Sequence, residues 1–264
     1  MVPPTQSYII ASTPRSGSNL LADGLAQTNI AGKPCERFPR PSEHIHSEVA
    51  TRRAALLAQP PPEDSYNEAL DAEYIKRILE LGTTENGVFG IKIHRFQIDD
   101  AVRRFRSYLG SLNSDHHEIL STAFPNLSYI WLRRRDKISQ AVSWHKAVQS
   151  NQYVKLHDSA PSAEELNNEI EFDYTAIRTY WSALECSDKG WQYFFSTLKE
   201  NPLTIWYEDL SEDYQSTIKG TLAYLKLDKQ PFVVSPPRYR KTADLQSSEW
   251  VERFKSIHSR SHTT

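Results

Sequence analysis

Four short apolar runs, each ending in polar residues, set the pattern of this 264-residue chain. The first run, Tyr8–Ala11, is followed by small polar residues and then by apolar residues at helical spacing. This order predicts a strand, a loop and a helix that ends near Thr28. The other three runs are short and rich in β-branched or aromatic residues, so each is predicted to be a strand: Val88–His94, Leu127–Leu132 and Leu203–Leu210.

Helical periodicity fills the intervals between these runs. S-x-x-E capping boxes begin predicted helices over residues 65–81 and 162–199, and acidic residues begin another over 211–226. Asp136 is predicted to cap the helix after the third run. Strands that alternate with helices indicate an α/β fold of three layers, with a mostly parallel central sheet flanked by helices. We expect it to form a single domain, residues 1–264.

Three stretches depart from this regular pattern. Residues 39–64 are polar and rich in proline, so we expect an excursion over the surface. Residues 146–162 lack periodicity and carry polar and small side chains, which predicts a mobile loop near a ligand. Residues 236–258 contain a basic cluster with Arg240 and Lys241, and on the residues alone an ordinary solvated tail is an equal alternative.

The loop after the first run carries the residue types of an anion site. The start of a helix leaves backbone N–H groups without partners and carries partial positive charge. Gly17 lets the backbone approach a ligand, Ser16, Ser18 and Asn19 add hydrogen-bond donors, and Arg15 adds a planar cation. This inventory suits a phosphate or a sulfate group. A simple turn with a serine cap is the alternative.

The usual ATP or GTP loop is missing from this segment. Its pattern, G-x-x-x-x-G-K-[ST], requires a glycine before Pro14 and a Lys-Ser/Thr pair after Gly17, and the chain has neither. An ATP-dependent P-loop kinase therefore remains an alternative that lacks its motif.

A second cationic cluster, Arg133–Arg135, follows the third predicted strand. Open α/β sheets bind ligands at the carboxyl ends of their strands, so this cluster is a candidate anion site, with Ser143 on the flank of the next helix. A basic surface patch is the alternative. Lys92 interrupts the second run and either reaches an anion from the strand or faces solvent from a half-exposed strand.

Glu36 stands between prolines that hold the chain in fixed bends. A glutamate in a partly dry pocket is suited to remove a proton from a hydroxyl group, because burial raises its pKa toward that task. The alternative is an exposed glutamate that forms a solvated ion pair with Arg37.

Composition limits the classes of partner and compartment. The net charge of −2 gives no global attraction to nucleic acid or to an anionic membrane, so local cations must hold any anionic ligand. Cys35 and Cys186 make no disulfide framework, and neither they nor the histidine pair His116-His117 has the spacing of metal ligands. We find no membrane-spanning run and no secretory signal, so we expect a cytoplasmic location.

Three spaced motifs resemble those of sulfotransferases that use 3′-phosphoadenosine 5′-phosphosulfate (PAPS) as donor. Residues 14–18, PRSGS, resemble the core of their 5′-phosphosulfate loop. Arg135 and Ser143, eight residues apart, resemble the pair that holds the 3′-phosphate. The pattern G-x-P-x-E-x-F at residues 32–38 resembles the Stf0 branch, whose best-known member sulfates trehalose in mycobacteria. The resemblance implies a P-loop-like fold.

The resemblance also implies roles for individual residues. Glu36 would be the catalytic base, with Phe38 and Lys92 beside it at the acceptor, and Arg15 would stabilise charge during transfer. Which of the three consecutive arginines reaches the 3′-phosphate stays open. The residues implied in donor binding are Arg15, Ser16, Gly17, Ser18, Asn19, Arg135, Ser143, Arg240 and Lys241.

The implied function is transfer of a sulfuryl group from PAPS to a hydroxyl of a carbohydrate or glycolipid, with 3′-phosphoadenosine 5′-phosphate (PAP) as product and no metal. Members of this branch often form dimers, so the resemblance also suggests a homodimer. The alternatives are the kinase and a non-catalytic module that binds PAP or PAPS.

Overall fold

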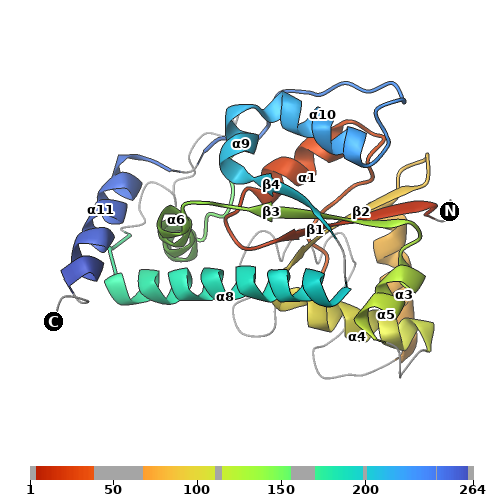
Figure 1. Ribbon diagram of the computed structural model, residues 1–264, viewed down its shortest axis with the longest axis horizontal. Helices are drawn as coiled ribbons and strands as arrows, with labels where there is room; N and C mark the ends of the chain where they lie inside the picture. Colours follow the sequence, from red (N-terminus) through yellow and green to blue (C-terminus); the bar gives the residue numbers. More distant parts are fainter. Residues whose placement is uncertain are drawn as a thin grey trace.

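The computed structural model describes six segments of the chain: residues 4–38, 68–110, 115–155, 170–198, 201–241 and 243–260. At their centre lies a four-stranded sheet in the order β2-β1-β3-β4, with every neighbouring pair parallel (Figure 1). The predicted α/β fold with a mostly parallel sheet is therefore confirmed. The strands are β1 (Gln6–Ser12), β2 (Val88–His94), β3 (Leu127–Arg133) and β4 (Leu203–Trp206).

Helices cover both faces of this sheet. Figure 1 shows α1, α9 and α10 above it and α4 and α8 below it. The described helices are α1 (Ser18–Gln27), α3 (Glu68–Gly82), the 3-10 turn η1 (Arg95–Gln97), α4 (Ile98–Leu109), α5 (His116–Ala123), α6 (Lys137–Ser150), α8 (Tyr174–Leu198), α9 (Tyr207–Glu212), α10 (Tyr214–Tyr224) and α11 (Leu245–Arg260).

The alternation of side chains along β1 explains the two layers. Ile9 and Ala11 pack with α3, α4, α5 and α8, whereas Tyr8 and Ile10 pack on the opposite face with α1 and α10. All four side chains are fully buried. A parallel strand buried on both faces reads as a continuous apolar run, which is why these segments were recognisable from the sequence.

A separate core lies beyond the end of the sheet, among α6, α8 and α11. Its buried members include Val142, Leu184, Trp250 and Phe254. Figure 1 shows α11 at this end of the molecule, past α6. On α8, Ile177 and Leu184 are fully buried and belong to this core.

The fourth predicted strand is shorter than expected. Only Leu203–Trp206 pair with β3. The strand does not continue to Leu210, because α9 begins at Tyr207. Glu208 and Asp209 lie in the first turn of α9, where negative charge is favoured by the partial positive charge of the helix start. The next helix, α10, begins at Tyr214 instead of residue 211.

The predicted loop over residues 146–162 is also corrected in part. Residues 146–150 form the last turn of α6, where Ala147 is buried and the Ser150 hydroxyl donates to the Lys146 carbonyl. The helix ends at Asn151, which has a left-handed φ of 52°. Residues 156–162, the excursion at 39–64 and the capping serines at 65 and 162 lie outside the described residues.

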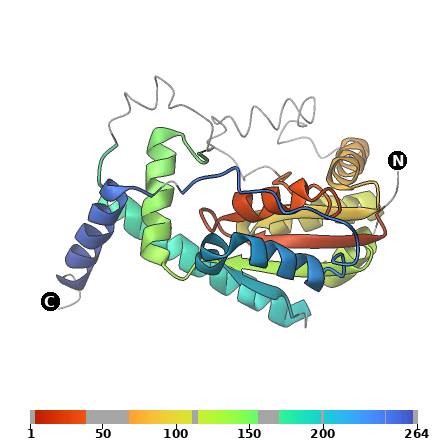
Figure 2. The same ribbon diagram turned by 90° about the horizontal axis from the view of Figure 1, so that it is seen from above.

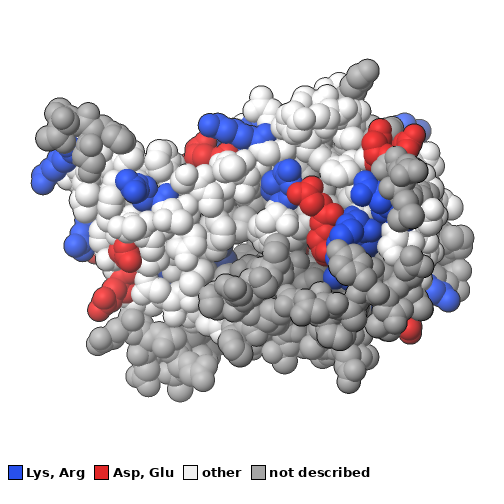
Figure 3. Space-filling model, turned by 90° about the horizontal axis from the view of Figure 1, so that it is seen from below, with Lys and Arg blue, Asp and Glu red and all other residues white. Residues whose placement is uncertain are grey.

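Charged side chains are mixed on the face drawn in Figure 3. In its described part, basic and acidic side chains lie next to one another. Ion pairs of this type occur on α4, where Arg104 Nε lies 2.9 Å from Asp100 Oδ2. No helix in the described segments is long and apolar enough to cross a bilayer.

Two neighbouring aromatic residues on α8 provide a test of the packing. Phe195 is 4% exposed and contacts the rings of Tyr129, Trp131 and Trp191, whereas Tyr193 is 70% exposed. Phe195→Ala should lower the free energy of unfolding by about 3–5 kcal/mol, because it leaves a cavity. Tyr193→Ala should change it by less than about 0.5 kcal/mol. Urea unfolding measures both values, and equal losses would contradict this packing.

Candidate active site

The parallel sheet brings three strand ends to one edge of the molecule. The register pairs Ser12 at the end of β1 with His94 at the end of β2, and β3 runs alongside to Arg133. The loop that leaves β1 then enters α1 at Ser18. The candidate site is built around this loop, at the carboxyl edge where ligands of open α/β sheets bind.

The loop itself is a tight turn held by α6. The Ser16 hydroxyl donates to the Thr13 carbonyl at 2.8 Å, and the fully buried Gln140 donates its amide to Thr13 Oγ1 at 2.9 Å. Arg15 and Gly17 both have left-handed φ values, 62° and 85°. The helix α1 begins directly after this turn with no side-chain cap, so its first N–H groups are available to an anion at the loop.

Gly17 is required by a close approach as well as by its φ. A Cβ atom at this position would lie 2.5 Å from Cδ2 of Tyr207, the first residue of α9. The Tyr207 ring therefore lies directly against the loop. On the same ring, the Arg134 guanidinium carbon lies 4.7 Å from the centroid, within reach of a cation–π contact.

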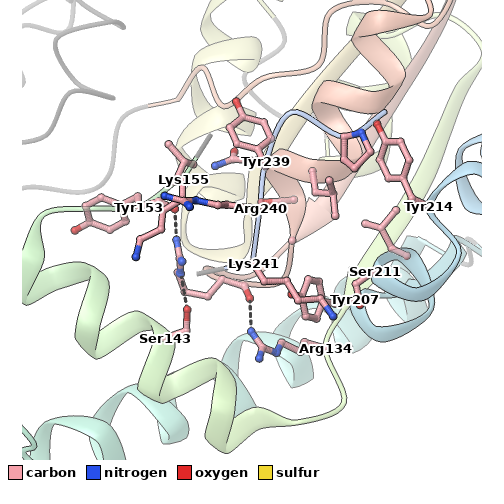
Figure 4. A pocket seen from close by; sticks show the side chains of 18 residues that line it. Arg134, Ser143, Tyr153, Lys155, Tyr207, Ser211, Tyr214, Tyr239, Arg240 and Lys241 are labelled. Atoms are coloured by element: carbon pink, nitrogen blue, oxygen red, sulfur yellow. Dashed lines mark hydrogen bonds between the residues drawn. The ribbon is translucent and has the colours of Figure 1, made fainter. Parts of the chain in front are cut away.

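A cavity of about 320 Å³ opens over the loop (Figure 4). Arg134 and Ser143 lie on one side of it, and Arg240 lies beside Lys155 across from them. Tyr207, Ser211 and Tyr214 complete a third side. Of the predicted donor-binding residues, the following line the cavity: Arg15, Gly17, Ser18, Asn19, Ser143, Arg240 and Lys241. Ser16 is fully buried beneath it.

Two partly buried arginines supply positive charge to the cavity. Arg15 donates from Nε to Ser143 Oγ at 3.0 Å and from its terminal nitrogen to the Tyr153 carbonyl, and Arg134 donates to the Arg15 carbonyl at 3.3 Å. Burial, together with the nearby charge of Arg134, lowers the pKa of Arg15 to about 10. Burial likewise lowers the pKa of Arg134. Arg15 remains cationic near neutral pH, so two like charges face one cavity that favours an anion.

The structure distinguishes the three consecutive arginines. Arg134 lines the cavity, whereas Arg135, the residue predicted to hold a phosphate, points away from it and binds both oxygens of Asp209 at 2.7 and 2.8 Å. Arg133 approaches the buried Asp188 at 3.4 Å. Arg134 therefore lies at the cavity and Arg135 does not, because Asp209 on α9 holds the Arg135 side chain outside.

The segment between α10 and α11 closes over this cavity. Figure 2 shows it running along the molecule past α1 toward α11. The backbone N–H of Arg240 donates to the Lys155 carbonyl at 3.0 Å, and Arg238 Nε donates to Asp23 on α1 at 3.0 Å. Within residues 236–258, the basic cluster therefore belongs to the pocket and is not a solvated tail.

A carboxylate lies next to the loop on its other side. Glu36 forms an isolated parallel bridge with Lys92 of β2, and its side chain is only 11% exposed. Its Oε2 lies 3.3 Å from Lys92 Nζ and 3.6 Å from His94 Nε2, and its Oε1 accepts from the Gln97 amide at 2.9 Å. The expected alternative, a solvated pair with Arg37, is excluded because Arg37 is buried and donates to backbone carbonyls.

Lys92 connects this carboxylate to the loop. The side chain is 4% exposed, which rules out the surface lysine considered from the sequence. Its ammonium donates to Asn19 Oδ1 at 2.7 Å, and Asn19 lines the cavity. The cationic cavity and Glu36 are therefore adjacent parts of one site.

Phe38 does not belong to the site surface. Its ring is fully buried and packs edge-on against Phe105 at 5.9 Å and Tyr74 at 6.3 Å. The expectation that it contacts an acceptor is therefore wrong. Instead, it anchors the segment that carries Glu36, and its carbonyl accepts from Gln97 at 2.6 Å.

Sequence reasoning missed His94, Gln97 and Tyr207, and it left Arg134 as one of three open candidates for the 3′-phosphate. One signal was available, because residues two apart in a strand point to the same face, so Lys92 and His94 must lie together at the end of β2. In the segments that the structure describes, no group of three or more His, Cys, Asp or Glu side chains could hold a metal ion.

Comparisons with known proteins agree with this geometry. The family described as Stf0 sulphotransferase matches residues 7–256. A protein named trehalose 2-sulfotransferase from Mycolicibacterium smegmatis is 29% identical over 263 residues, and one of the same name from Mycobacterium tuberculosis is 24% identical over 259 residues. Each alignment covers 94% of this chain and 94% of the relative.

A crystal structure of a sulfotransferase from Alicyclobacillus acidocaldarius shares the fold. Its TM-score is 0.50 at 12% identity, with 97% of this chain and 93% of that chain covered. The three-layer, P-loop-like fold is thus the one found in sulfotransferases. Because the family match spans residues 7–256 of 264, this chain belongs to the Stf0 sulphotransferase family.

Proposed function

We propose that this sulfotransferase moves the sulfuryl group of PAPS to a hydroxyl of a carbohydrate or glycolipid, with trehalose as the first acceptor to test. The observation that carries the proposal is the pairing of a cationic cavity with a nearly buried carboxylate across one loop. Both relatives named trehalose 2-sulfotransferase cover 94% of this chain, which supports the choice of acceptor.

The cavity suits a donor with negative charge at both ends. The N–H groups at the start of α1, with the hydroxyl groups of the loop, would hold the 5′-phosphosulfate. Arg134, Ser143 and the basic segment with Arg240 and Lys241 would hold the 3′-phosphate, because they line the same cavity away from Glu36. Arg15 lies between these groups, bound to Ser143.

Transfer needs one base and charge stabilisation, and the chain offers both. The acceptor oxygen attacks the sulfur, the bond from sulfur to the 5′-phosphate oxygen breaks, and the hydroxyl proton passes to Glu36, leaving PAP and a sulfated acceptor. Lys92 and Arg15 would stabilise the negative charge that develops on the leaving phosphate and the sulfuryl oxygens. The scheme requires no metal.

The cytoplasmic location and the homodimer are further parts of this proposal. Light scattering of the purified protein measures its mass in solution and decides between a monomer and a dimer. An activity assay with PAPS and candidate acceptors also tests the two alternatives, the kinase and the non-catalytic binding module.

Substitution of Glu36 tests its role as the base. With labelled PAPS and a panel of trehalose, other disaccharides and glycolipids, the wild type should form a sulfated product without added metal. Glu36→Gln should lower kcat by about 10²–10⁴-fold, the usual contribution of a general base, while PAP affinity changes less than about twofold. Glu80→Gln is the matched control, because Glu80 is an exposed partner of Arg77 on α3.

Three results would contradict the proposal in different ways. Normal turnover by Glu36→Gln would show that Glu36 is not the base. Turnover of ATP with magnesium, without transfer from PAPS, would favour the kinase. Equal affinity for PAPS and PAP with no product from any acceptor would favour the binding module.

Substitutions at the adjacent Arg134 and Arg135 test which of them binds the nucleotide. Arg134→Gln should weaken PAP binding about 10- to 100-fold, since a hydrogen bond to a charged group contributes about 1.5–3 kcal/mol. Arg135→Gln should change it less than about threefold, because that side chain is bound to Asp209 outside the cavity. Isothermal titration calorimetry with PAP measures both. A larger effect from Arg135→Gln would show that the wrong arginine has been assigned.

A further inference from the structure

A chain of buried polar groups ends on Glu36. The Ser12 hydroxyl lies 3.0 Å from His94 Nδ1, and His94 Nε2 faces Glu36 Oε2 at 3.6 Å. Ser12 is fully buried and His94 is 4% exposed. Burial of a polar side chain destabilises the fold unless the side chain is hydrogen-bonded, so each polar atom in this arrangement needs a partner.

The shorter of the two contacts of the Ser12 hydroxyl points to one tautomer of His94. Ser12 Oγ lies 3.0 Å from Nδ1 but 3.5 Å from its other acceptor, the Ile93 carbonyl. When the hydroxyl donates to Nδ1, the proton of the neutral imidazole resides on Nε2 and points at the carboxylate of Glu36. The opposite tautomer would set a lone pair against the carboxylate oxygen.

Gln97 holds the other oxygen of the same carboxylate. Its Oε1 accepts from the His94 backbone N–H at 2.8 Å, which leaves its Nε2 to donate to Glu36 Oε1 at 2.9 Å and to the Phe38 carbonyl at 2.6 Å. Gln97 is fully buried. The amide cannot be reversed without losing these hydrogen bonds, so its orientation is fixed by its partners.

This series of buried polar groups, from Ser12 through His94 to Glu36, is connected to the loop that precedes α1. Ser12 is the last residue of β1, and its carbonyl accepts from Trp191 Nε1 at 2.9 Å. Ser12 therefore joins the start of the loop to His94, and through His94 to Glu36. The distance between the carboxylate and the loop is set by buried side chains and by the β1–β2 register.

We infer that His94 is a positioning residue, which presents its Nε2 hydrogen to Glu36 and, with Ser12 and Gln97, sets the carboxylate relative to the donor loop. This inference rests on the proposed role of Glu36 as base. His94 itself neither takes the acceptor proton nor contacts the donor. It acts through Glu36, because the reaction slows when the base is held in the wrong place, even when donor and acceptor still bind.

Two amide variants test the inference. The amide nitrogen of glutamine in His94→Gln reaches about as far as imidazole Nε2 and can still donate to Glu36. That of asparagine in His94→Asn reaches only about as far as Nδ1 and cannot. His94→Asn should lower kcat about 10- to 100-fold, whereas His94→Gln should stay within about fivefold of wild type. The KM for the acceptor and the PAP affinity should change less than about threefold in both.

A double mutant separates positioning from mere structural support. His94→Asn added to Glu36→Gln should lower kcat no further than Glu36→Gln alone, because the effect of His94 passes through the carboxylate. Equal losses of kcat in the two amide variants, or a full additional loss in the double mutant, would overturn the inference. If the wild type transfers no sulfuryl group at all, the proposed function fails instead. Denaturant unfolding of each variant identifies losses due to misfolding.

Discussion

The site depends on the parallel pairing of β1 with both β2 and β3. Parallel neighbours end at the same edge, so the register of Ser12 with His94 places the polar residues of β2 beside the loop that leaves β1. The pairing with β3 brings the three arginines to the other side of the same loop. One loop therefore has Glu36 and its polar partners on one flank and the cationic cavity on the other, and the proposed transfer depends on this arrangement.

The arginines that line the cavity have different partners from the exposed Arg135. Arg135 is bound by the carboxylate of Asp209, as is usual for an exposed arginine. The contacts that hold Arg15 and Arg134 include a hydroxyl, carbonyl oxygens and the ring of Tyr207. These contacts orient both cations. Together with Lys155, Arg240 and Lys241 they concentrate positive charge in one cavity of a chain whose net charge is −2.

The sequence predicts the fold well because β1, β2 and the middle of β3 are buried and read as apolar runs. It also predicts that loop residues line an anion-sized cavity, because the chemistry of a Gly- and Ser-rich loop is local. It leaves the choice among the three arginines open, since that choice depends on Asp209, which lies in another helix. It fails for Phe38, whose burial depends on Tyr74 and Phe105. It also misses the hydrogen bonds of Gln97, which join segments far apart in the chain.

The central claim is that this cavity is built for a nucleotide with separate 3′- and 5′-anions. Calorimetric titration of the protein with PAP, with adenosine 5′-phosphate and with ATP plus magnesium tests it most directly. The account predicts that PAP binds in metal-free buffer at least about tenfold more tightly than adenosine 5′-phosphate, because the second phosphate gains charge-assisted hydrogen bonds. Tight binding of ATP with magnesium and no heat with PAP would contradict it.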